Sequence, residues 1–147
     1  MADTVKVEYL YPPNLLDGDW DENQGNLKVI VRLSCISDGT GETDAIKIRL
    51  SDLKTHSGKV PARTVVEWIE YQITGLACVL EWDRSPNAEI IRLNGIGQGI
   101  EGKRDYTQFG GKCDPGGDDR SGNILMSTTG ADSGDTYEIN LCLRLKD

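Results

Sequence analysis

The sequence is poor in the side chains from which most metal and nucleophilic sites are built. It holds one histidine, and its cysteines occur singly, without a C-x-x-C pair. A structural zinc site needs four thiolate or imidazole ligands, which usually come in close pairs. His56 lies in the turn-like stretch 55–58 and has no evident neighbour that would orient it toward a thiol in a Cys–His nucleophile pair. We therefore expect no metal, no cofactor and four free thiols, at Cys35, Cys78, Cys113 and Cys142.

Long apolar runs are also absent. No stretch approaches the ~20 apolar residues that a membrane-spanning helix requires. The start, Met1–Thr4, has neither the basic region nor the apolar region of a secretory signal. The expectation is a chain made in a reducing cytoplasm, where thiols stay free.

Positive charge is in short supply: 16 Lys and Arg stand against 24 Asp and Glu, for a net charge of −8. This balance argues against non-specific binding of nucleic acid, because Lys and Arg must neutralise phosphates there. It argues equally against docking on an anionic membrane. The length suits one domain over residues 1–147, and 17 glycines with 5 prolines leave little room for long helices.

What the sequence does contain is a repeated alternation of apolar and polar residues with a period of two, which is typical of half-buried strands. These runs predict about eight strands and no helix beyond one turn at 51–54. Such a set favours an all-β fold, an antiparallel β-sandwich of jelly-roll or immunoglobulin-like type. The expected strands lie at residues 5–11, 27–35, 46–50, 64–73, 77–82, 88–93, 124–127 and 137–145.

The alternation also predicts which side chains share a face. It places Ile46 and Ile48 on the opposite face from Lys47. In the next run it places Trp68 opposite the main apolar set. Glu67 is the exception within that set, which consists of Val65, Ile69, Tyr71 and Ile73.

Residues 94–122 break the pattern, because this stretch is rich in glycine and shows no strand period. We predict one long Gly-rich loop, and loops beyond about 12–15 residues are often functional. The large apolar side chains in this stretch favour a loop that becomes ordered when these side chains anchor it on the surface of a partner. The alternative, equally open, is a loop that folds back and buries them on its own sandwich. The candidate partner contacts are Ile96, Ile100, Tyr106 and Phe109, the only phenylalanine of the chain.

Three short motifs match ligand sites only in part. Residues 97–102 fit G-x-G-x-x-G, but no helical run follows to receive a pyrophosphate. The acidic stretch 17–23 lacks the glycine and glutamate positions that an EF-hand needs. Residues 114–119 form a second acidic stretch. We interpret both as solvated turns, with weak Ca²⁺ binding left open, and expect no enzyme because no nucleophile–base motif is present.

Several segments, taken in order, resemble a known class of proteins. The sequence is similar to small virion structural proteins of tailed bacteriophages, particularly environmental and marine ones, over roughly residues 5 to 145. Each motif alone is a common turn or strand, so the order carries the resemblance. The segments are Asp38–Asp44 with Ile46–Ile48, Leu53, Val66–Tyr71, Val79–Asp83, Ile91–Gly95, Gly122–Gly130 and Gly134–Tyr137.

The resemblance implies a small β-sandwich that decorates or cements a capsid from the outside of the virion, after synthesis in the host cytoplasm. Its expected partners are the major capsid protein and neighbouring copies of itself, as a homo-oligomer, without nucleic acid or membrane. The alternative is a carbohydrate- or ligand-binding sandwich that stacks sugars on Trp20, Trp68 or Trp82. Exposure of these indoles discriminates between the two interpretations.

Overall fold

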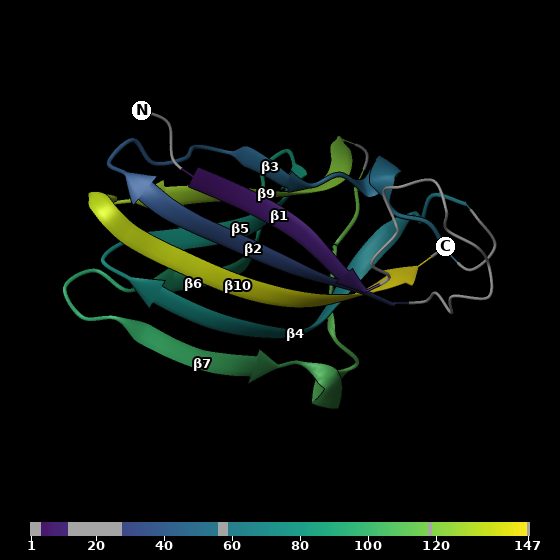
Figure 1. The fold of residues 1–147 in the computed structure, drawn as a ribbon. Helices are drawn as coiled ribbons and strands as arrows, with labels where there is room; N and C mark the ends of the chain where they lie inside the picture. Colours follow the sequence, from purple (N-terminus) through teal and green to yellow (C-terminus); the bar gives the residue numbers. More distant parts are fainter. Residues whose placement is uncertain (1–3, 12–27, 56–58, 118, 147) are drawn as a thin grey trace.

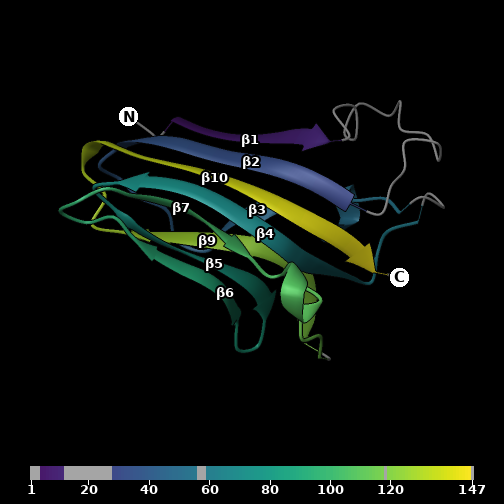
Figure 2. The ribbon, with the colours of Figure 1, turned by 90° about the horizontal axis from the view of Figure 1, so that it is seen from below.

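The computed structural model describes residues 4–11, 28–55, 59–117 and 119–146. These residues form the expected all-β sandwich: ten strands make two antiparallel sheets that face each other (Figures 1 and 2). Sheet A has the order β1-β2-β10-β4-β7, with β8 also pairing with β4, and sheet B has the order β3-β9-β5-β6. The strands of sheet A are β1 (Thr4–Tyr11), β2 (Lys28–Asp38), β10 (Ser133–Lys146), β4 (Arg63–Thr74), β7 (Ile100–Asp105) and β8 (Lys112–Cys113). Sheet B consists of β3 (Ala45–Ile48), β9 (Arg120–Thr129), β5 (Ala77–Arg84) and β6 (Ala88–Asn94), and two 3-10 turns are η2 (Leu50–Asp52) and η3 (Thr107–Phe109).

The core lies between the sheets and is built from alternate residues of each strand. On β10, every second side chain from Tyr137 to Leu145 is buried, because this central strand is flanked by β2 and β4. From sheet B, the indole of Trp82 enters the same core and donates its Nε1–H to Thr64 Oγ1 at 3.1 Å. The one polar atom of this large side chain is therefore satisfied inside the core.

Strand β4 departs from regular alternation at one position. Its pairing with β10 shifts register between Cys142 and Leu143, which leaves Glu67 as an extra residue, a β-bulge. The bulge puts Val66 on the face of Ile69 and turns Val65, which is 1% exposed, to the other face, against Gly111. The prediction that Val65 shares a face with Ile69 is therefore wrong. Glu67, the one acid within the predicted apolar set, is the extra residue of the bulge.

Strand β3 contains a second irregularity, between Ile46 and Ile48. Ile46 is 43% exposed and Lys47 only 7%, the reverse of the predicted alternation, because the shift turns both Lys47 and Ile48 toward the core. The buried ammonium group pairs with the carboxylate of Glu42. The same carboxylate accepts a hydrogen bond from the hydroxyl of Tyr137 at 2.6 Å.

Residues 94–122 are interrupted by regular structure, so the prediction of one long loop is wrong. The segment contains β7, η3, β8 and the start of β9. Strand β7 pairs with β4 from Trp68–Asp105 to Ile73–Ile100. All residues of β7 after Ile100 are exposed, and an exposed edge strand need not alternate apolar and polar residues. This is why its sequence shows no period of two.

Candidate functional site

Phe109 is the most exposed large apolar side chain in the described part of the chain, at 81%. It ends η3 within the turn of residues 106–111 between β7 and β8, which we call the Phe109 turn. Figure 1 shows this turn at the end of β7, projecting from the lower corner of the sandwich. Aromatic side chains are enriched among the residues that carry interface energy, so Phe109 is a candidate contact residue.

Backbone hydrogen bonds fix the Phe109 turn. The Phe109 N–H donates to the Tyr106 carbonyl at 3.0 Å, and the Gly111 N–H donates to the same oxygen at 2.9 Å. Gly111 has φ +91°, and a Cβ there would lie 2.4 Å from Val65 Cγ1, so only glycine fits. Because these hydrogen bonds order the backbone of the turn, a contact made through it would cost little backbone entropy.

The carboxylate of Asp105 sets the start of η3. Its Oδ1 accepts hydrogen bonds from the Thr107 N–H at 2.9 Å and from the Thr107 hydroxyl at 2.5 Å. These bonds, the hydroxyl bond first, lower the pKa of Asp105. An ionised carboxylate therefore caps the turn at neutral pH, as side-chain acceptors do at helix starts.

Glu67, the bulge residue of β4, supports the base of the turn. Its backbone carbonyl accepts the Tyr106 N–H at 2.8 Å, and its carboxylate pairs with Lys28 Nζ at 2.9 Å and Arg144 Nε at 3.2 Å. Arg144 Nη2 in turn donates to the Gly110 carbonyl at 2.7 Å. The hydrogen bond to Glu67 raises the pKa of Lys28.

These polar groups surround a hollow of about 390 Å³ beside the turn. The sequence analysis did not assign Glu67 to a site. The one indication was that Glu67 is the only acid in an otherwise apolar set of residues. The hollow is lined by Lys28, Glu67, Thr107, Gly110, Gly111 and Arg144.

The structure separates the four candidate contact residues. Ile100 and Tyr106 are partly buried and pack against the core, as the fold-back interpretation expected. Ile96 is 50% exposed, but it lies in the turn between β6 and β7, against Gly130. Ile96 and Phe109 therefore lie at opposite ends of β7 and do not form one surface (Figure 1).

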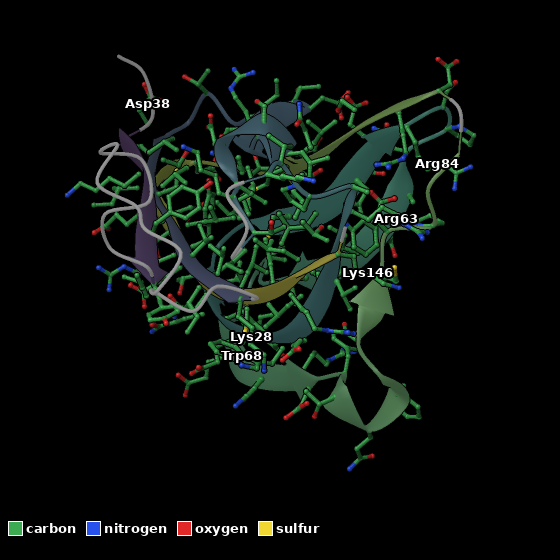
Figure 3. The ribbon with its side chains drawn as sticks, turned by 90° about the vertical axis from the view of Figure 1, so that its right-hand side faces the viewer. Lys28, Asp38, Arg63, Trp68, Arg84 and Lys146 are labelled. Atoms are coloured by element: carbon green, nitrogen blue, oxygen red, sulfur yellow. The ribbon has the colours of Figure 1, made fainter. Side chains whose placement is uncertain are left out.

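The tryptophans differ in exposure. Trp82 is 1% exposed, whereas Trp68 is half-buried on the outer face of sheet A, as predicted, where Figure 3 shows it near Lys28. Lys103 Nζ lies 5.1 Å from the Trp68 ring centroid and occupies part of its face. Trp20 lies outside the described residues. Of the described indoles, Trp68 alone has an exposed surface that could stack on a sugar.

A second hollow, of about 320 Å³, lies on the outer face of sheet A, where it begins at Glu70, two residues along β4 from Trp68. Its walls come from neighbouring strands, since Asn140 pairs with Glu70 and Gln72 pairs with Glu101. The Oδ1 atom of Asn140 is buried and has no hydrogen-bond partner among the residues described. The lining is polar and acidic, and consists of Glu70, Tyr71, Gln72, Glu101, Gly102, Glu138 and Asn140.

All four thiols are free in the structure. Burial raises the pKa of Cys78 to about 12, and burial followed by the charge of Glu67 raises the pKa of Cys142. Both groups are protonated at neutral pH and are weak nucleophiles. His56, the histidine considered as a partner for a thiol, lies outside the described residues.

The three partial motifs have different outcomes. The acidic stretch 17–23 lies outside the described residues. After residues 97–99 the chain continues into β7, a strand. In the stretch 114–119, Asp114 is 1% exposed and accepts bonds from the Gly116 N–H at 2.8 Å and Arg120 Nη1 at 3.3 Å. The prediction of a solvated turn is therefore wrong for Asp114, whose carboxylate holds the turn together.

Within the described ranges, no group of three or more His, Cys, Asp or Glu side chains is placed to hold a metal ion. No helix found there is long and apolar enough to cross a bilayer. No protein-family model, no curated protein and no solved structure matches the chain.

Proposed function

We propose that the chain is a non-enzymatic structural protein of a bacteriophage virion, which attaches to the outer surface of the capsid as a decoration or cement protein. The observation that carries this proposal is the 81% exposure of Phe109 on an ordered turn. The resemblance of the ordered segments to phage virion proteins implies the major capsid protein as the partner.

The surroundings of Phe109 fit an anchor in a protein interface. Interface energy concentrates in a few large side chains, often aromatic, with polar groups around them. Lys28, Glu67 and Arg144 form such a polar border beside Phe109, and the fixed turn presents the ring without a large ordering cost. On a symmetric shell, many modest contacts of this kind add up to strong attachment.

The test measures binding of the purified chain to undecorated capsids. Truncating a central anchor costs ~2 kcal/mol or more, which is a roughly 30-fold weaker affinity, so Phe109→Ala should lose most capsid occupancy. Its melting temperature should stay unchanged, because the removed ring contributes little to the core. The matched control is Ile36→Ala, which truncates another exposed apolar residue, 58% exposed, on β2. Parental binding by Phe109→Ala would refute the anchor, and a parent that does not bind capsids would refute the virion function.

Two further variants separate contact from folding. Tyr106→Ala removes a ring that packs against the core, so it should lower both the melting temperature and capsid binding. Leu141→Ala empties a fully buried position of β10 and should cost roughly 2–5 kcal/mol of stability. Binding by the folded fraction of Leu141→Ala should match the parent, because this residue lies far inside the core.

A carbohydrate-binding function is the second candidate, favoured by the polar hollow on the outer face of sheet A, whose carboxylates are hydrogen-bond acceptors, and by the partly exposed indole of Trp68 on the same face. Buried sugar hydroxyls need such acceptors, and an indole face stacks on a pyranose ring. A glycan array probed with the parent and with Trp68→Ala tests it. Selective glycan binding that the substitution abolishes would favour this function over capsid attachment.

A further inference from the structure

The edge of sheet A at β1 differs from the other three sheet edges. Edge strands usually carry protection against pairing, such as charge, short length, bulges or a covering side chain. Strand β7 has charged, exposed side chains, and β3 has only 4 residues and a register shift. The β6 edge is bulged, and its Ile90 carbonyl accepts a hydrogen bond from Lys112 Nζ at 2.6 Å.

Strand β1 also carries charge, at Lys6 and Glu8, but these two charges have opposite signs and alternate with exposed apolar side chains. It pairs with β2 in regular register from Thr4 to Tyr9, and β2 is its only strand partner in the described structure. Figure 2 shows β1 along one border of sheet A, on the far side from β9, β5 and β6. Among the residues that the structure describes, no strand pairs with its second edge.

The inner face of β1 is also incompletely covered. Val5 and Val7 pair with Cys35 and Leu33 of β2, whose side chains face the core, yet they remain 38% and 37% exposed. Tyr9, the next residue on that face, is partly buried against the core. Apolar side chains along an open strand edge favour the addition of a strand from another chain.

We propose that two copies of the chain pair through β1, antiparallel and around a twofold axis at Val7, so that their two A sheets become one continuous sheet. This inference goes beyond capsid attachment and does not depend on it. The occupant is a second copy because β1 is complementary to itself in this register and in no neighbouring one.

The charges of β1 define that register. Residues opposite each other in an antiparallel pair have their side chains on the same face of the sheet. In two identical strands this holds only if opposite residues are an even number of positions apart. The twofold axis must therefore pass beside a residue and not between two residues. With the axis at Val7, Lys6 lies opposite Glu8 of the other copy, twice. An axis at Lys6 would place two lysines together, and an axis at Glu8 would place two glutamates together. The Val7 register also pairs Val5 with Tyr9 on the apolar face.

The experiment measures the dimer dissociation constant of the full chain by sedimentation over a wide concentration range. A single edge contact is small, so the parent should be monomeric when dilute and approach twice its mass of 16.2 kDa when concentrated. Lys6→Glu and Glu8→Lys each replace both attractive pairs between the copies with repulsive ones. Glu8→Lys also breaks the pair of Glu8 with Arg32 of its own chain, at 3.2 Å, so Lys6→Glu is the cleaner of the two variants. Each variant should raise the dissociation constant about tenfold.

An equimolar mixture of the two variants supplies the decisive result. In the mixture, β1 of the Lys6→Glu variant carries two acids and β1 of the Glu8→Lys variant carries two lysines. These strands attract each other, so the mixture should form a heterodimer with the dissociation constant of the parent. The double variant Lys6→Glu/Glu8→Lys should recover it alone, which covers the case in which one single variant folds poorly. Lys103→Glu makes the same charge change on the opposite edge of sheet A and should leave the constant unchanged.

Three results would overturn the proposal. They are a parent that stays monomeric at every concentration, single variants that dimerise like the parent, and a mixture that does not recover association. None of these results bears on Phe109, so capsid binding and self-pairing fail separately.

Discussion

Glu42 and Glu67 each hold two polar partners, and their side chains are almost equally buried, at 10% and 11% exposed. The partners differ. Lys47, paired with Glu42, is 3% exposed, whereas Lys28 and Arg144, paired with Glu67, are 53% and 38% exposed. Water and salt therefore screen the Glu67 pairs much more than the Glu42 pair. We therefore expect the burial of the partner, rather than that of the carboxylate, to decide how much each ion pair contributes to stability.

The largest expected effect is that of Glu42→Gln. The substitution leaves the Lys47 ammonium buried without a counter-charge, and breaking a buried pair in this way costs about 3–5 kcal/mol. Urea unfolding measures the loss. The double variant Glu42→Gln/Lys47→Met, which removes both charges, should recover most of it. A loss under about 1 kcal/mol for the single variant would show that Lys47 reaches water after all.

The second expected effect is a loss of stability at alkaline pH. It depends on the buried thiols near the two carboxylates, Cys78 near Glu42 and Cys142 near Glu67. Burial, then the Glu42 charge, raises the pKa of Cys78 from 9.0 to about 12, so the folded chain keeps a proton that the unfolded chain releases. The resulting stability is fully present below pH 9 and is lost as the pH rises from 9 toward 12. The slope approaches about 1.4 kcal/mol per pH unit.

Chemical unfolding between pH 9 and 10 measures this slope, and Cys78→Ala should reduce it. Cys142→Ala provides the comparison at the other cluster. There the positive charges of Lys28 and Lys103 oppose the rise in the thiol pKa, so the reduction should be smaller. Equal reductions would mean that Lys28 and Lys103 do not lower the pKa of Cys142, and that burial alone sets both thiol pKa values.

The smallest expected effect on stability is that of Glu67→Gln, about 1 kcal/mol or less, because both partners are largely solvated. The difference from the parent should shrink further in 1 M salt, where the Debye length is about 3 Å. Capsid binding should nevertheless weaken, since Arg144 loses the carboxylate that orients it toward the Gly110 carbonyl. Glu89→Gln, which breaks the exposed pair with Arg92, is the control and should change neither quantity.

The surroundings of Glu42 and Glu67 also show which features the sequence pattern did not predict. Alternation predicted most strands and the outward position of Trp68, since a half-buried strand records its two faces in consecutive residues. It failed at Lys47 and at Val65, where one extra residue in a strand reverses the faces that follow. It also missed β7, whose exposed edge position leaves no apolar period.

The sequence by itself determined the all-β class, most strand positions and the composition of the core, because these follow from local apolar alternation. Only the tertiary structure decided which polar groups meet. Glu42 reaches Tyr137 and Glu67 reaches Arg144 through strand pairing between distant segments, which no local pattern encodes. The fates of Phe109 and Tyr106, three residues apart, were decided in the same way. The Tyr106 N–H bonds to the carbonyl of the Glu67 bulge and its ring packs against the core, whereas Phe109 is 81% exposed.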